Sequence, residues 1–231
     1  MIEEEKKGMT SAEFWVFLLM SICSGLMIGI GGTASLLAAS LFEKWGKIIG
    51  ALLFSLGIFA IVTYEMNLFT GMVANIPKMG VNKIWRLPFC FLGNVAGVAI
   101  VALLVSCTPL ADKVIPQAKL IATEKLSAEN WWLSAFCSAI LCGALITLSV
   151  WSVKYSPRKG LDATLGVTFP IIVFAFCGFD HSVANVLYFF FYGQCTWQII
   201  GYEVLAVLGN IVGGIILPLI VMLREYAILS K

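Results

Sequence analysis

Charged residues are scarce in this sequence. They make up 12% of its 231 residues, whereas hydrophobic residues make up 60%; a soluble domain is about a quarter charged and less than half apolar. The formal net charge is only +2, which is too small to indicate an acidic or basic macromolecular partner. This composition excludes an ordinary cytosolic enzyme, a nucleic-acid binder and a disordered chain. Long continuous apolar runs, rather than short alternating strands, favour an all-α membrane protein over an outer-membrane barrel.

Motifs for catalysis, nucleotide binding and metal binding are also missing. The sequence has no G-x-x-x-x-G-K-[ST] loop, no nucleophile elbow, no H-E-x-x-H and no C-x-x-C. Its seven cysteines are odd in number and almost all lie in apolar runs, so we interpret them as small packing residues. One histidine cannot assemble a zinc site without other ligands. We therefore expect no enzymatic activity, no metal and no cofactor.

The apolar runs predict six membrane-spanning helices, because a span needs about 20 apolar residues. The second and the fifth are long and interrupted. The expected spans cover residues 14–42, 46–76, 87–105, 131–153, 161–192 and 198–223. We expect one transmembrane domain over residues 1–231, with an N-terminal segment at 1–12 and a connecting loop at 106–130.

The distribution of Lys and Arg predicts the orientation of the chain. Six spans place both termini on one side, and that side collects ten Lys and Arg residues against five on the other. Because positive residues favour the cytoplasm, both termini are expected there and the 106–130 loop outside, in a multi-pass protein of the cytoplasmic membrane. The first ten residues, MIEEEKKGMT, are charged before any apolar run, so we expect no cleaved signal peptide.

The sequence also repeats. The letters LGN at 92–94 recur at 208–210, and Gly25 has a counterpart in Gly143; the offsets are 116 and 118 residues. The repeat unit is therefore three spans, and an odd number of spans makes the two copies cross the membrane in opposite senses. Such a 3+3 inverted repeat is the plan of many channels and secondary transporters. A chance match of small residues in glycine-rich helices is the alternative.

Polar residues interrupt the second and fifth expected spans at equivalent places. The first interruption reads TYEMNLFTG at 63–71 and the second reads CGFDHSVAN at 177–185. Non-helical backbone at membrane depth is tolerated only where it is buried or lines a cavity, so each stretch predicts a break followed by a half-helix. Asn67 or Thr70 would cap the first half-helix and Asp180 the second. Two such N-termini would attract an anion, and matching broken helices predict a transport site.

Each ionisable residue at the breaks also has a purely structural interpretation. His181, the only histidine, is either a buried structural imidazole or a residue of the transport pathway, and its place in a break favours the pathway. Glu65 either fixes the loop through backbone N–H groups or lines the pore. Asp180 is interpreted as a cap rather than a carrier of transported protons.

At the two breaks the sequence resembles the formate/nitrite transporter family. LFTG at 68–71 matches the L-F-T-[GS] core of the family's first signature, and GFDHSVAN at 178–185 matches its G-F-[ED]-H-S-[IV]-A-N segment. The six-span plan and the repeat extend the resemblance over essentially the whole chain. The resemblance implies an aquaporin-like fold, a homopentamer with one pore per subunit, and small monovalent anions such as formate, nitrite or hydrosulfide as substrates.

The resemblance also implies roles for individual residues. Thr70 and His181 correspond to the polar pair of the pore, and Lys125 stands nearest to the family's vestibule lysine. The residues that would support the break loops are Glu65, Asn67, Asp180 and Asn185. The apolar constrictions of the pore correspond to Phe54, Ile58, Leu68, Ile146 and Phe174.

Three positions depart from the family's pattern. The first signature normally has Gly at the position of Glu65 and an acidic residue at that of Asn67. The fourth span normally carries Asn where this chain has Gly143. These departures touch the selectivity region.

These residues suggest a mechanism and leave two alternatives. An unpaired anion is costly among apolar side chains, and the implied substrates are conjugate bases of weak acids. We hypothesise that His181, whose type has an unperturbed pKa of about 6.5, protonates the anion and that Thr70 orients the substrate or the imidazole. The partners would be an anion and a proton, the bilayer and further copies of the chain, with no nucleic acid. A neutral-solute or water channel fits apolar constrictions too, and the departures at Glu65 and Gly143 suggest a structural subunit with a vestigial pore.

Overall fold

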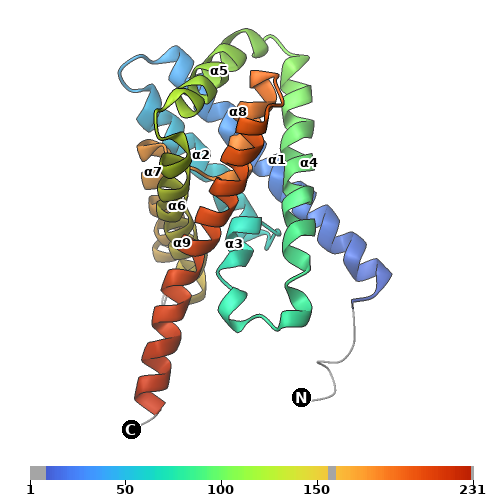
Figure 1. Ribbon diagram of the computed structural model, residues 1–231, viewed down its shortest axis with the longest axis vertical. Helices are drawn as coiled ribbons and strands as arrows, with labels where there is room; N and C mark the ends of the chain where they lie inside the picture. Colours follow the sequence, from blue (N-terminus) through green and yellow to red (C-terminus); the bar gives the residue numbers. More distant parts are fainter. Residues whose placement is uncertain (1–8, 156–159, 230–231) are drawn as a thin grey trace.

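Helices joined by short connections make up the protein. The computed structural model describes residues 9–155 and 160–229, and within them it contains no strand (Figure 1). The helices are α1 (Ser11–Leu41), α2 (Gly46–Thr63), α3 (Phe69–Val73), the 3₁₀ turns η2 (Ile76–Lys78) and η3 (Val81–Lys83), α4 (Arg86–Ser106), α5 (Ala111–Ser127), α6 (Trp131–Tyr155), α7 (Leu161–Cys177), α8 (Ser182–Tyr192) and α9 (Trp197–Leu229).

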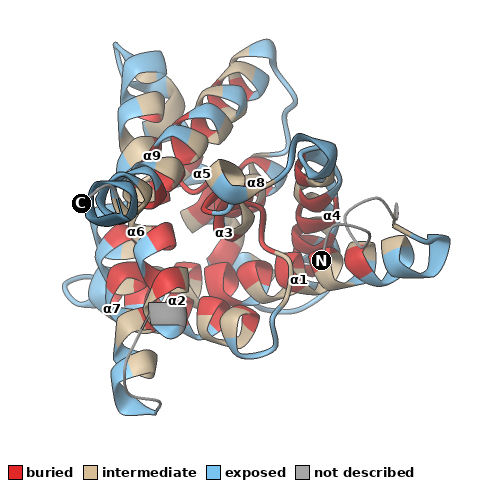
Figure 2. Cartoon of the chain, turned by 90° about the horizontal axis from the view of Figure 1, so that it is seen from below, coloured by how far each residue is buried: buried red, intermediate tan, exposed pale blue. Residues whose placement is uncertain are grey.

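Five helices, α1, α2, α4, α6 and α9, are long and apolar enough to cross a bilayer. The pair α7 and α8, bent by 42° at a short break, adds a sixth span if the pair is counted as one. The outward faces carry exposed Leu, Ile, Val, Phe and Trp side chains, whereas buried residues gather on the inward faces around α3 (Figure 2). Outward apolar faces of this kind suit a hydrocarbon solvent, so the protein is a multi-pass membrane protein.

The helix starts follow local capping. The first span begins at Ser11, three residues before the expected position, because Thr10 and Glu13 form a capping box: the Thr10 hydroxyl accepts from the Glu13 N–H, and the Glu13 carboxylate accepts from the Thr10 N–H at 2.7 Å. The last helix extends to Leu229, beyond the expected end at 223.

The connection at 106–130, expected as a loop, is mostly the helix α5. Val114, Ala118 and Ala122 recur every four residues and are fully buried, which gives this short segment one apolar face directed at the rest of the protein. Pro116 lies inside the helix without ending it. Prolines and mixed charges suggested a loop, but the narrow stripe of small apolar residues and its packing against α1 and α8 decide the structure.

Two helix crossings at glycines draw the core together. A Cβ at Gly25 of α1 would lie 2.8 Å from the Cα of Asn94 in α4, and a Cβ at Gly143 of α6 would lie 2.9 Å from the Cα of Asn210 in α9. Only glycine permits these distances, so α1 contacts α4 and α6 contacts α9 backbone to backbone. Each crossing thereby fixes an asparagine in the interior.

The start of α1 and the end of α9 lie at one end of the molecule, the lower end in Figure 1. The Phe14 and Phe89 rings, 5.4 Å apart, join the first turns of α1 and α4, and Lys78 pairs with Glu225 near the end of α9 at 3.3 Å. Helix α5 lies at the opposite end, where the Gln198 amide donates to the Leu126 carbonyl at 2.7 Å.

Candidate functional site

Asn94 of α4 organises the break between α2 and α3. Its Oδ1 accepts from the Phe69 N–H at 2.8 Å, at the first residue of α3. Its Nδ2 donates to the Ser21 carbonyl at 2.8 Å and to the Asn67 carbonyl at 2.9 Å. One buried amide therefore caps the short helix, holds the loop before it and ties both to α1.

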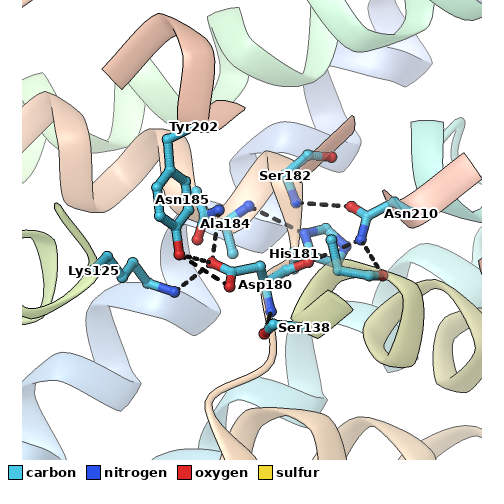
Figure 3. A network of polar contacts seen from close by, with 10 residues as sticks. Lys125, Ser138, Asp180, His181, Ser182, Ala184, Asn185, Tyr202 and Asn210 are labelled. Atoms are coloured by element: carbon cyan, nitrogen blue, oxygen red, sulfur yellow. Dashed lines mark hydrogen bonds and ion pairs between the residues drawn. The ribbon is translucent and has the colours of Figure 1, made fainter. Parts of the chain in front are cut away.

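Asn210 of α9 does the same for the break between α7 and α8 (Figure 3). Its Oδ1 accepts from the Ser182 N–H at 2.9 Å, at the first residue of α8. Its Nδ2 donates to the Ala139 carbonyl at 2.9 Å and to the Asp180 carbonyl at 2.8 Å. The two asparagines of the repeated LGN letters thus make matching sets of hydrogen bonds in the two halves of the chain.

The caps expected from the sequence are wrong. The N-cap of α3 is Leu68, with no side-chain cap, and the N-cap of α8 is His181 rather than Asp180. Asn67 donates instead to the Phe17 carbonyl at 3.1 Å. A distant asparagine accepts from the first N–H of each half-helix, and in α8 the His181 side chain accepts from the Ala184 N–H as well, so the expected caps are not needed.

The starts of α3 and α8 also offer an anion fewer free backbone N–H groups than the sequence predicts. Helix α3 has only five residues. In α8 the N–H groups of Ser182, Ala184 and Asn185 already donate to Asn210 Oδ1, His181 Nδ1 and the His181 carbonyl. Protein acceptors therefore take most of the free N–H groups that would otherwise attract a negative charge.

His181 and Thr70 meet in the interior of the protein. Thr70 Oγ1 and His181 Nε2 are 3.0 Å apart, and both residues are buried. The Ala184 N–H donates to His181 Nδ1 at 3.1 Å, so Nδ1 is an acceptor. In a neutral imidazole the other nitrogen then carries the hydrogen, and Nε2 donates to the Thr70 hydroxyl. That hydroxyl keeps its own hydrogen free to donate further.

A cavity of about 480 Å³ reaches His181 from the α5 end. Its lining includes Phe54, Phe174, His181, Lys125 and Asn185. The Phe54 and Phe174 rings meet edge to face at 5.5 Å, and Phe174 stacks on the His181 ring at 5.7 Å. The aromatic rings therefore form the inner end of the cavity, with the imidazole beside them.

The other residues expected at constrictions lie deeper. Ile58, Leu68 and Ile146 are buried, and neither they nor Thr70 belong to the lining of the cavity. The structure thus brings Phe54 and Phe174 to the cavity, whereas the remaining three lie in the buried apolar core.

Asp180 is the centre of a polar network at the wall of the cavity (Figure 3). Its carboxylate accepts from Lys125 Nζ at 2.5 Å, from Asn185 Nδ2 at 3.1 Å and from the Tyr202 hydroxyl at 3.0 Å. Its N–H donates to the Ser138 hydroxyl at 2.9 Å. Lys125 and Asp180 are both largely buried, so the lysine enters the cavity as one half of an ion pair rather than as a free cation.

Glu65 does not support the break loop with its side chain. The residue is exposed, and within the described part of the chain its carboxylate makes no hydrogen bond or ion pair. Its backbone has a positive φ of 52°, a conformation that glycine adopts at little cost and other residues rarely adopt. The structure thus explains why glycine suits this position.

Sequence reasoning missed several residues of the site. Asn94 and Asn210 were visible as the repeat but not as caps, although an asparagine inside an apolar span is itself a signal of an internal hydrogen-bond network. Tyr202 and Ser138 gave no such signal, because hydroxyls are common in membrane helices. Their roles depend on which helix face meets the Asp180 loop.

Comparisons with known proteins agree with the geometry. A family model described as formate/nitrite transporter matches residues 1–224. The chain is 26% identical to a probable formate transporter of Methanothermobacter thermautotrophicus, over 86% of this chain and 84% of the relative. It is 28% identical to the formate channel FocA of Haemophilus influenzae, over 77% and 74% of the two chains.

Two solved structures share the fold. One is described as a pentameric formate channel with formate bound; it superposes with a TM-score of 0.73 at 21% identity and covers 94% of this chain and 98% of its own. The other is described as an FNT family ion channel, with a TM-score of 0.76 at 23% identity over 90% and 88% of the two chains.

Proposed function

The chain belongs to the formate/nitrite transporter family, and on this basis we propose that it passes small monovalent anions of weak acids, namely formate, nitrite or hydrosulfide, across the cytoplasmic membrane. It acts as a channel or as a proton-coupled transporter. The observation that carries the proposal is the buried contact of 3.0 Å between Thr70 and His181 at the inner end of a cavity. Formate channels among its relatives support the substrate class.

The proposed architecture is an aquaporin-like 3+3 inverted repeat of six spans. In it α2 with α3, and α7 with α8, are two broken spans that occupy equivalent places. The matching hydrogen bonds of Asn94 and Asn210 support this reading, because each holds the break of its own half. The related pentameric formate channel supports a homopentamer with one pore in each subunit.

The proposed path runs from the cavity to the opposite face. An anion enters beside Lys125, passes Phe54 and Phe174, and reaches His181 and Thr70. It then crosses between Ile58, Leu68 and Ile146, which have to move apart for passage. Because an ion without partners is very costly among such side chains, the anion crosses this part as the neutral acid.

The hydrogen bonds of His181 constrain how the proton is delivered. Protonation at Nδ1 has to break the bond from the Ala184 N–H, so the cationic imidazole forms only transiently. It then gives its Nε2 proton through the Thr70 hydroxyl to the anion and is left neutral with its hydrogen on Nδ1, and one further proton exchange returns the hydrogen to Nε2 and restores the bond from Ala184. The Thr70 hydroxyl, which accepts from Nε2 in the resting state, is placed to pass its own proton on.

Uptake of labelled formate into proteoliposomes at several pH values tests the proposal. Uptake by the wild-type protein should rise as pH falls, and His181→Phe should change this dependence, because a phenyl ring cannot exchange a proton. Phe176→Leu, at an exposed position of α7, is the control and should keep the wild-type profile. An unaltered pH profile in His181→Phe would disprove the proton relay.

A neutral-solute or water channel is the second candidate function. The observation that favours it is the ion pair of Lys125 with Asp180, since it leaves the cavity without an unpaired cation at this position. Proteoliposomes that take up water or glycerol but no labelled formate would support this alternative over the anion channel.

A further inference from the structure

Glu203 of α9 is a carboxyl group that the path described above does not use. It lines a groove of about 690 Å³ between α4, α8 and α9, whose walls are almost entirely apolar. Both of its carboxyl oxygens are buried, and neither has a hydrogen-bond partner among the residues that the structure describes. Exposed Val204 and Leu208 also line this groove, which therefore opens on the outer face of the helices.

The polar network of the cavity lies directly behind this carboxyl. Glu203 follows Tyr202, whose hydroxyl donates to Asp180, and Asp180 in turn pairs with Lys125. Asn185 lines the cavity, so α8 separates the cavity from the groove and Asn185 stands between the two.

The elements around Glu203 bring few other titratable groups. Helices α3 and α4 face the groove with apolar side chains, among them Phe69 and Leu87. The turn before α9 adds Gln194 and Cys195 at its edge. The charged groups of the network behind Glu203 are Asp180 and Lys125, whereas the other charged residues that line the cavity, Glu43, Lys47 and Glu124, are exposed.

One cation cannot balance two carboxylates. Lys125 and Asp180 neutralise each other across 2.5 Å, so an ionised Glu203 would add an uncompensated negative charge beside the route of the anion. An apolar groove offers that charge no donor, and the cost of burying it is high.

We propose that Glu203 is a protonated carboxylic acid whose ionisation makes the buried end of the cavity more negative: while it is protonated the anion enters, and when it ionises the anion is repelled. Glu203 is a positioning residue in this role, because it acts through charge on the cavity wall and does not contact the substrate. This inference rests on the proposed function, to which it adds a second titratable group besides His181.

Infrared spectroscopy of the purified protein tests the protonation state independently of transport. The wild-type protein at neutral pH should show a carboxylic-acid C=O band that disappears in Glu203→Gln and persists in Glu225→Gln. Glu225 is the matched control, because it lies on the same helix, pairs with Lys78 on the surface and is outside the cavity. Absence of the Glu203 band would mean that the group is ionised, for instance through a donor from a second subunit, and would overturn the inference.

Formate flux across the pH range tests the charge role. The ratio of Glu203→Gln flux to wild-type flux should rise about tenfold toward alkaline pH, the order expected when one unit charge near the anion is removed at an effective dielectric constant of about 20. The same ratio for Glu225→Gln should stay flat. A flat ratio for Glu203→Gln in protein that remains monodisperse would contradict the charge role. Flux without the acid band overturns this inference alone, whereas no formate flux in the wild type overturns the proposed function and the charge role with it.

Discussion

Single residues decide the geometry of the breaks, and two asparagines decide most of it. Asn94 and Asn210 each bond one N–H at a helix start and two carbonyl groups, all inside the protein. Irregular backbone at membrane depth has no water to satisfy it. The asparagines supply these partners, so α3 has no side-chain cap of its own, and at α8 the His181 imidazole adds one local acceptor.

Glu65 occupies a backbone conformation that favours glycine, and its replacement gives a prediction at this scale. Glu65→Gly should raise stability by roughly 0.5–1 kcal/mol, because relief of the left-handed strain exceeds the greater entropy that glycine loses on folding. Thermal unfolding in detergent measures this change.

The control for this prediction is Glu43→Gly, an exposed position at which φ is not positive. That variant should be no more stable than the wild type. A lower unfolding midpoint in Glu65→Gly would mean that the Glu65 side chain has a stabilising role that its exposed position does not reveal.

At the scale of helices, close crossings explain a departure from the family pattern. Gly143 stands where the family normally has Asn. The backbone of Asn210 in α9 leaves no room for a side chain at this position. The departure therefore follows from how closely α6 and α9 approach, and it does not by itself indicate a vestigial pore.

Gly143→Ala should lower stability by about 1–3 kcal/mol, the usual cost of overpacking a closed core site. Gly201→Ala is the matched control, because its added Cβ would lie 3.4 Å from the Trp131 ring, an ordinary contact. It should be neutral or stabilising by up to about 1 kcal/mol through helix propensity. Equal unfolding midpoints of the two variants would show that α6 and α9 separate easily, contrary to the crossing described here.

Helix α5 illustrates a misreading at the same scale. Its sequence contains Pro116 and charges of both signs, which are typical of a loop. Three small apolar residues on one face are enough for a helix here, because α1 and α8 provide the surface that covers them. Lys125, near the end of α5, reaches Asp180 only because this segment is helical and lies across the break.

At the scale of the whole molecule, the prediction is which end of the protein faces the cytoplasm. Cys107 is exposed and lies at the α5 end, whereas Lys83 lies in η3, among the connections near the opposite end. If both termini are cytoplasmic, a membrane-impermeant thiol reagent added to intact cells should label a variant that keeps only Cys107. A cysteine-free variant carrying Lys83→Cys should be labelled only after the cells are permeabilised. The reverse pattern would invert the proposed orientation.

The amino-acid sequence by itself determined the all-helical membrane character, because apolar runs of about 20 residues are the pattern that helices need in a hydrocarbon solvent. It also showed polar residues inside two apolar segments, because such groups stand out there, whereas the pairing of Thr70 with His181 was predicted only through the family resemblance. The tertiary structure decided what those residues contact: that His181 caps α8 while bonding Thr70, that distant asparagines hold the helix starts, and that Lys125 is already paired. These facts follow from contacts between residues as many as 111 positions apart, and no local pattern encodes which helix faces meet.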